Sequence, residues 1–484
     1  MQQQLNKFWQ KPGLVFLSLF ILALVFYFDA FSHFFYQDDL FHFQISQAES
    51  LSEAAAWFNP INKFGYQIYR PLGVQVVFFI IQTLFGLNHS AFTLLTLLLL
   101  SGNAWLIWKL LMRKTYPLAA WLLSVFYLVH HQNIGIVYFL STIQFELALF
   151  FTLVSIHLLH YKKKGWQWQV YLLYVATLFS QEIAMLNAVI LPLLLYITNP
   201  TAAKKNIRLW GSLLGTLLAY LVMRFYFINT QIFIDHSHYV VSLNPKDWLV
   251  NLGWFNLWML SVPEYVINFV GSGLRPLPPL LGQYRLESIL SLSVLTVSAG
   301  VFLQLSKKIF TKPKNLVYLL CFLLALAPVL VFPWHKYVYH LPIASVFVLL
   351  FLAANLGQKP TKTTPLLLLL LIAAAVITNL IDRSTSYNYQ RGAISAHFKR
   401  TVDWSKLRTG PQKILVQNDP NFVVFAADWG NTSTQAKVIF KENLFFTLQT
   451  GNEQLEVIYE DDLPADTVNP ADYDYTVVAK FEQL

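Results

Sequence analysis

The sequence predicts an all-α, polytopic membrane protein of about eleven spans with a small α/β domain at its C-terminal end. Hydrophobic residues make up 56% of the 484-residue chain and charged residues 12%, whereas a soluble domain keeps roughly a quarter of its residues charged. The apolar residues form long unbroken runs, without the alternating or helical stripes of half-buried elements. We therefore expect a multi-pass integral protein in contact with membrane lipid.

The remaining composition excludes two other classes. The net charge of +9 comes largely from short basic clusters beside the apolar runs, where they oppose anionic lipid headgroups, so no nucleic acid partner is expected. The single cysteine, Cys321, lies inside an apolar run. It provides no disulfide framework and no zinc site built on thiolates.

The basic clusters set the direction of the spans. They lie at 7–11, 109–114, 162–164, 204–208, 307–314 and 359–362. If all are cytoplasmic, as the positive-inside rule expects, an even number of crossings separates each consecutive pair. Segment 71–87 is then a helix on the outer surface, segment 165–203 is a hairpin that turns outside at Ser180-Gln181-Glu182, and segment 248–270 is interfacial.

This count gives a cytoplasmic N-terminus and an extracytoplasmic C-terminus. The predicted spans are 14–30, 89–110, 117–129, 137–160, 169–179, 183–197, 209–227, 288–305, 315–332, 338–356 and 364–381. They form a membrane domain, 1–381, whose long outer loops are 32–69 and 228–287. From 382 charges return, and 413–417 and 457–459 read as short strands. Residues 382–484 are therefore expected to form the small extracytoplasmic domain.

A pair of carboxylates, Asp38 and Asp39, follows the first span on the outer side. Adjacent carboxylates among aromatic residues repel each other, which raises the pKa of one of them unless a cation neutralises the pair. Such a pair suits a general base. Its oxygens can also hold a divalent metal such as Mg²⁺ or Mn²⁺, and the chemistry can equally proceed without one. The alternative is a solvated polar cap on the span.

Further polar residues gather at the same outer face, where charges near span ends are functional candidates. Arg70, which follows Tyr69, and Lys336, which follows His335, could each bind an anion or simply contact lipid headgroups. Glu182 lies at the outer turn of the hairpin. Arg224 lies inside a span near its outer end, where an unpaired guanidinium is expensive to bury.

An acid/base pair beside cations is the combination needed to transfer a sugar from a polyprenyl phosphate. The base takes a proton from an acceptor hydroxyl, and the cations stabilise the phosphate as it leaves. A lipid carrier would explain why such groups are embedded in a membrane.

Several short motifs resemble those of the C superfamily of glycosyltransferases (GT-C), and within it the protein O-mannosyltransferases and the transmembrane and tetratricopeptide-repeat mannosyltransferases with their bacterial relatives. In order along the first 350 residues or so, the matching stretches are Asp38-Asp39, Tyr69-Arg70-Pro71-Leu72, Asn88-His89, Val129-His130, Ser180-Gln181-Glu182 and Lys336-Tyr337-Val338-Tyr339-His340-Leu341-Pro342. No tetratricopeptide repeats follow. The family usually has lysine at the position of Gln181 and often arginine at that of Lys336.

The resemblance implies an inverting hexosyltransferase that uses a mannose-like polyprenyl phosphate monosaccharide, in a bacterial plasma membrane. By resemblance a carboxylate of the pair, with Asp39 favoured over Asp38, would be the catalytic base. Arg70 and Lys336 would bind acceptor or donor phosphate, and Glu182 would support the site. From their place at the same outer face, Tyr69, His335 and Arg224 are also expected to bind substrate. The acceptor, whether protein, lipid or polysaccharide, stays open.

Other classes remain as alternatives. A transporter or flippase of lipid-linked glycans would place its polar residues near the bilayer midplane in two related halves. A ligase or polymerase that uses diphosphate-linked glycans would lack the acidic pair after the first span. A relative that has lost activity and acts as a partner is the third alternative.

Overall fold

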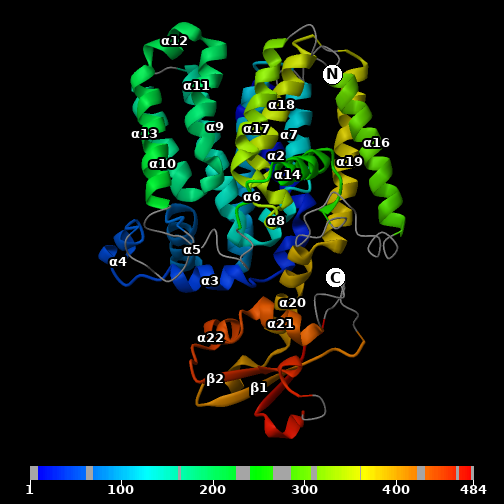
Figure 1. Ribbon diagram of the computed structural model, residues 1–484. Helices are drawn as coiled ribbons and strands as arrows, with labels where there is room; N and C mark the ends of the chain where they lie inside the picture. Colours follow the sequence, from blue (N-terminus) through cyan, green and yellow to red (C-terminus); the bar gives the residue numbers. More distant parts are fainter. Residues whose placement is uncertain are drawn as a thin grey trace.

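The computed structural model describes residues 9–60, 69–161, 165–224, 240–264, 285–306, 313–359, 361–421, 431–464 and 468–480. A bundle of long helices stands above a smaller C-terminal unit with a sheet, and short helices from early in the chain lie between the two (Figure 1). Much of the predicted outer loop 228–287 lies outside the described residues, as do the basic residues at 162–164 and 307–312.

The long elements of the bundle are apolar helices. They are α2 (Pro12–Phe26), α6 (His89–Leu111), α7 (Pro117–Val129), α9 (Ile143–Tyr161), α10 (Trp166–Ser180), α11 (Asn187–Thr198), α13 (Ile207–Met223), α16 (Arg285–Ser306), α17 (Leu316–Leu330), α18 (Pro342–Leu356) and α19 (Thr363–Thr385). Local sequence explains where some of them begin. The side chain of Asn88 accepts from the Ala91 backbone N–H at the start of α6, and Pro117 occupies the first turn of α7, where no N–H is needed.

Four apolar segments in the described part are long enough to cross a bilayer. They are α6, the segment Leu140–His160, α16 and α19, with mean hydropathy between 1.6 and 2.4. Shorter apolar helices of 10–17 residues accompany them, among them α2, α7, α13, α17 and α18. The structure therefore has the helices of a membrane protein, and the number and direction of the crossings stay predictions.

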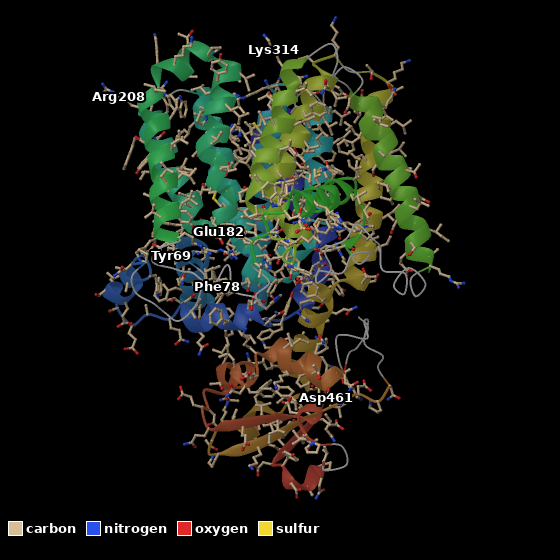
Figure 2. The ribbon with its side chains drawn as sticks, in the orientation of Figure 1. Tyr69, Phe78, Glu182, Arg208, Lys314 and Asp461 are labelled. Atoms are coloured by element: carbon tan, nitrogen blue, oxygen red, sulfur yellow. The ribbon has the colours of Figure 1, made fainter. Side chains whose placement is uncertain are left out.

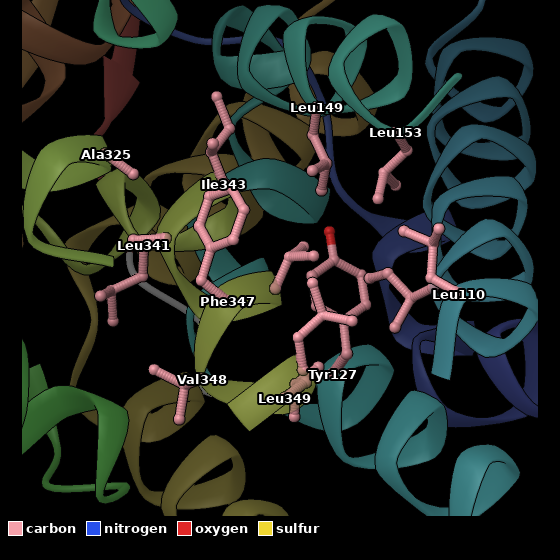
Figure 3. Packing of buried hydrophobic residues seen from close by; sticks show 14 of the residues in the cluster. Leu110, Tyr127, Leu149, Leu153, Ala325, Leu341, Ile343, Phe347, Val348 and Leu349 are labelled. Atoms are coloured by element: carbon pink, nitrogen blue, oxygen red, sulfur yellow. The ribbon is translucent and has the colours of Figure 1, made fainter. Parts of the chain in front are cut away.

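The bundle interior also contains a carboxylate that the sequence analysis did not single out. Tyr127 on α7 lies among apolar side chains such as Leu110 and Leu149 (Figure 3). Its hydroxyl donates to Glu146 Oε1 at 2.6 Å, and Asn103 Nδ2 donates to Glu146 Oε2 at 2.6 Å. Since a buried polar group is costly unless it is hydrogen-bonded, these contacts join α6, α7 and α9.

The predicted hairpin turn is present. Helix α10 ends at Ser180, Gln181 is extended, and a 3₁₀ turn, Glu182–Leu186, leads into α11. Next to it lies the predicted surface segment, a π-helical turn, Leu72–Val76, followed by α5 (Val77–Phe85). At 1.5 Å per residue this segment spans roughly 20 Å, less than the ~30 Å hydrocarbon core.

Helix α14 (Pro245–Met259) lies across the other helices instead of along them (Figure 1). This orientation agrees with the prediction that segment 248–270 does not cross. Two of its three tryptophans are not interfacial anchors, however: Trp254 and Trp258 are buried in the bundle core, whereas Trp248 is partly exposed.

The C-terminal unit is α/β, as predicted. Strands β1 (Gln412–Gln417), β2 (Leu455–Tyr459) and β3 (Tyr475–Val478) form a parallel sheet in the order β2-β1-β3, with Ile414 beside Val457 and Tyr475. Its helices are α20 (Tyr387–Thr401), α21 (Thr432–Phe440) and α22 (Leu444–Thr450). The sequence analysis found β1 and β2 but missed β3, which is four residues long and follows an acidic, polar stretch.

The return of charges at 382 does not coincide with the end of the last bundle helix. Helix α19 continues to Thr385, and both Asp382 and Arg383 are buried. Arg383 donates to Asp29 Oδ1 at 3.1 Å and to the carbonyl oxygen of Phe26 at 2.8 Å, so it ties α19 to the end of α2. These charges belong to the bundle because each has a partner there.

The close approach of Gly73 to α10 gives a stability prediction. A Cβ at Gly73 would overlap the backbone carbonyl of Ser180, which cannot move without disturbing the hairpin turn. We expect Gly73→Ala to lower the free energy of unfolding by about 1–3 kcal/mol, seen as a lower melting temperature in detergent. The control is Gly102→Ala in α6, where a Cβ meets nothing within 4 Å. Equal melting temperatures for the two variants would contradict the prediction.

Candidate functional site

A cavity of about 450 Å³ lies at the end of the bundle that carries Glu182. Figure 2 shows Glu182 and Tyr69 at this end, while Arg208 and Lys314 lie at the opposite end. Of the residues predicted to form the site, Asp38, Arg70, Glu182, Arg224 and His335 line the cavity, and Asp39, Tyr69 and Lys336 do not. The tertiary structure therefore brings together most of a set that is spread over 300 residues.

An ion cluster centred on Glu182 forms one wall. Arg70 donates from Nε and Nη2 to the two oxygens of Glu182, both at 2.6 Å, and Arg224 Nη2 lies 3.4 Å from Glu182 Oε1. All three side chains are at least three-quarters buried. The break between α10 and α11 makes this geometry available, because Glu182 begins a new turn directly after extended Gln181.

This wall contains hydrogen-bond donors that have no acceptor in the described part of the chain. Two guanidinium groups share one carboxylate, so the cluster carries one excess positive charge. Arg224 Nη1 and Gln181 Nε2 are buried without a hydrogen-bond partner among the described residues. Buried N–H donors without acceptors are costly, and both residues line the cavity, where an anion could accept from them. The wall is therefore suited to a phosphate or carboxylate.

The two adjacent aspartates occupy different environments. Asp38 lines the cavity, is 43% exposed, and has Lys441 Nζ at 3.8 Å from Oδ1. Burial at the cavity wall raises the pKa of Asp38, and the charges of Lys441, Arg391 and Arg70 oppose that shift. A carboxylate in this position can accept a proton from a group bound in the cavity.

Asp39 is fully buried behind Ser141. Its Oδ1 accepts from the backbone N–H and the hydroxyl of Ser141, both at 2.6 Å, and its Oδ2 accepts from the Tyr36 N–H at 3.4 Å. Burial raises the pKa of Asp39 to about 7, against the lowering effect of these donors. Asp39 reaches the cavity only through Ser141, which lines it.

The expected metal site does not fit this arrangement. The oxygens of Asp39 face N–H and O–H donors, which a cation would have to displace, and only Asp38 lines the cavity. In the described part of the chain no three His, Cys, Asp or Glu side chains form a group that could hold a metal ion. We derive no step through a metal.

A tight turn places Asp38. Gln37 has φ 48° and ψ −115°, and the Asp39 N–H donates to the Tyr36 carbonyl at 3.0 Å. These values are close to a type II′ turn, whose first central position favours glycine. A glutamine there costs on the order of 1–3 kcal/mol, which the surrounding contacts must offset.

The two remaining predicted residues, Tyr69 and Lys336, do not line the cavity and instead hydrogen-bond to backbone carbonyl oxygens. The Tyr69 hydroxyl donates to the carbonyl oxygen of Phe58 at 2.8 Å. Lys336 is buried, donates from Nζ to the Pro333 carbonyl oxygen at 2.6 Å, and has its pKa lowered by burial to about 8. Lys336 therefore supports the loop that carries His335 and does not face the cavity.

Aromatic side chains form another part of the cavity lining, which we call the aromatic wall. They come from the loop 335–340, from α20 and from the residues around α9, and include Tyr337, Tyr339, His340, Tyr387, Phe139 and Phe145. The sequence analysis missed Tyr387, because α20 was assigned to a separate domain. Its neighbours Tyr337 and Tyr339 stack with ring centroids 4.9 Å apart.

A buried hydrogen-bond chain holds the 335–340 loop. His131 Nε2 donates to the Trp258 carbonyl oxygen at 2.9 Å, and His131 Nδ1 is hydrogen-bonded to Asp382 Oδ2 at 2.6 Å. Asp382 also accepts from the Glu264 N–H, and Glu264 accepts from the Val338 N–H, each at 2.8 Å. These hydrogen bonds connect the 335–340 loop to the end of α14 and to α19.

Comparison with protein-family models, with curated proteins and with solved structures gives no match to this chain. The residue-level resemblance to the GT-C glycosyltransferases stays a prediction.

The raised pKa of Asp39 predicts a pH dependence of stability. The folded state binds this proton more tightly than the unfolded state, so the resulting stability is complete below about pH 4 and is lost as the pH rises through about 7. Asp39→Asn should flatten this part of a plot of melting temperature against pH. The exposed Asp472→Asn is the control and should follow the wild-type curve. Identical curves for wild type and Asp39→Asn would contradict the prediction.

Proposed function

We propose that this chain is a membrane glycosyltransferase that moves a monosaccharide from a polyprenyl phosphate to an acceptor hydroxyl. The observation that carries the proposal is one cavity that combines the carboxylate of Asp38 with the excess cationic charge around Glu182. It lies at the end of a bundle of apolar helices, where a polyprenyl chain could stay in lipid while its phosphate enters the cavity.

The donor phosphate is assigned to Arg224 and Gln181. Their buried, unpartnered N–H groups would donate to its oxygens, and the Arg70–Glu182 pair holds Arg224 in place. As the bond to the sugar breaks, the leaving phosphate keeps the electron pair and gains charge, which the preorganised donors stabilise. Lys336, expected from the resemblance to bind phosphate, has no part in this proposal because it does not line the cavity.

Asp38 is assigned the role of general base. It would take the proton of the acceptor hydroxyl while that oxygen attacks the anomeric carbon from the face opposite the phosphate, which inverts the configuration. The resemblance favours Asp39 instead, but that carboxylate contacts the cavity only through Ser141. The sugar ring would lie against the aromatic wall, as apolar ring faces do.

The proposal includes a direction in the membrane. The end with Arg208 and Lys314 would be cytoplasmic, and the cavity and the C-terminal unit would face outward, as the positive-inside rule requires. In this topology the chain crosses the membrane about eleven times and begins in the cytoplasm. We propose a bacterial plasma membrane as its location. The acceptor could be a protein, a lipid or a polysaccharide.

The test of the base is sugar release from a radiolabelled polyprenyl phosphate mannose by the purified protein in detergent. Asp38→Asn should lower kcat by about 10²–10⁴, and Asp39→Asn should lower it less. The reverse order would assign the base to Asp39. No turnover by wild type with any monophosphate donor would overturn the proposal in favour of a transporter or a diphosphate-dependent ligase.

The test of the phosphate site is Arg224→Met. We expect it to weaken donor binding at least tenfold, since a hydrogen-bonded charge contributes roughly 1.5–3 kcal/mol, with the larger effect on KM for the donor. Arg208→Met, at the opposite end of the bundle, is the matched control. Unchanged donor KM in Arg224→Met would contradict the assignment.

A further inference from the structure

The segment that carries Asp38 is held as much by the C-terminal unit as by the bundle. The Phe34 N–H donates to the Gly392 carbonyl oxygen at 3.0 Å, and the Gln37 N–H donates to that of Ile439 at 2.6 Å. The Ser395 hydroxyl donates to the Phe35 carbonyl oxygen. Each contact joins residues about 350 to 400 positions apart in the chain.

A shared apolar core accompanies these hydrogen bonds. Phe34, Phe35, Leu40 and Phe43 belong to one buried cluster with side chains of the C-terminal unit, such as Phe398, Ile439, Phe440, Phe445 and Phe446. The rings of Phe34 and Phe445 meet edge to face at 6.0 Å. The segment around Asp38 therefore has no separate core of its own.

One side chain of α20 contacts the strained residue beside Asp38. Arg391 Nη1 donates to Gln37 Oε1 at 2.8 Å, and Arg391 Nη2 lies 3.3 Å from Gln435 Oε1. The guanidinium also lies over the ring of Tyr387, 4.9 Å from its centroid. Arg391 is thus fixed on three sides, and Gln37 is held from both its backbone N–H and its side chain.

Lys441, a second cation near Asp38, is a weaker candidate for this role. Lys441 Nζ is 3.8 Å from Asp38 Oδ1, and both side chains are nearly half exposed. Exposed pairs at this distance contribute little because water screens them and the lysine side chain must be ordered. The contact through Gln37 is shorter, better partnered and more deeply buried.

We propose that Arg391 is a positioning residue for Asp38: by clamping Gln37 in a conformation that glutamine does not favour, it sets the direction of the carboxylate into the cavity. The C-terminal unit is then a structural part of the site. This inference rests on the proposed function for its kinetic consequence, because a misplaced reacting group slows the chemistry.

The test compares Arg391→Met with wild type in the full-length protein. We expect kcat to fall on the order of ten- to a hundredfold with little change in donor KM. Hydrogen–deuterium exchange should become faster at the amides of residues 36–41. Adding Gln37→Gly should restore part of kcat, because glycine adopts this turn without a clamp. Arg391→Lys, which keeps one donor, should be intermediate.

The matched control is Lys413→Met, an exposed cation of the same unit that pairs with Glu456 at 3.7 Å; its kcat and exchange should equal those of wild type. Unchanged kcat and exchange in Arg391→Met would overturn the proposal. The proposal would also be overturned if Gln37→Gly did not restore kcat and hydrogen–deuterium exchange became faster throughout α20 and β1, because Arg391 would then stabilise the whole C-terminal unit. If wild type shows no turnover, the proposed function fails, and exchange at residues 36–41 alone decides whether Arg391 positions this segment.

Discussion

The ion cluster at Glu182 is the interaction on which the rest of the cavity depends. It joins a loop residue, Arg70, a hairpin turn and the end of α13 at Arg224. A carboxylate buried beside two guanidinium groups is stable only while its partners are present, since desolvation of an unpaired charge costs several kcal/mol. The same arrangement leaves one net positive charge and unsatisfied donors, which is the property that a phosphate site needs.

A second constraint comes from the strained turn at Gln37. Strained backbone persists only where its surroundings over-determine it, and here those surroundings are Ile439, Arg391 and a core of phenylalanines that spans two parts of the molecule. The cations and the carboxylate of the cavity are thus positioned by different interactions. Arg70 and Arg224 are positioned by Glu182, and the segment of Asp38 is positioned by its packing against the C-terminal unit.

Features that depend on local sequence were predicted correctly, whereas features that depend on contacts between distant segments were not. The break at Ser180–Glu182 was predicted from length and charge alone, and strands β1 and β2 from short apolar stretches in a region where charges return. The distinction between Asp38 and Asp39 could not be predicted, because neighbouring residues in a turn have the same local sequence and only the packing of Ser141 separates them. Tyr387, Arg391 and Glu146 were missed because each acquires its environment from distant helices.

The sequence by itself determined the membrane character, the hairpin, the α/β nature of the C-terminal unit and the aspartate, glutamate and arginine residues that line the cavity. These depend on hydropathy and on charge next to apolar runs, which are local properties of the chain. Only the tertiary structure decided which carboxylate lines the cavity, that Lys336 is turned away from it, and that α20 completes a wall. Those outcomes depend on burial and hydrogen-bond partners, which arise when segments hundreds of residues apart pack together.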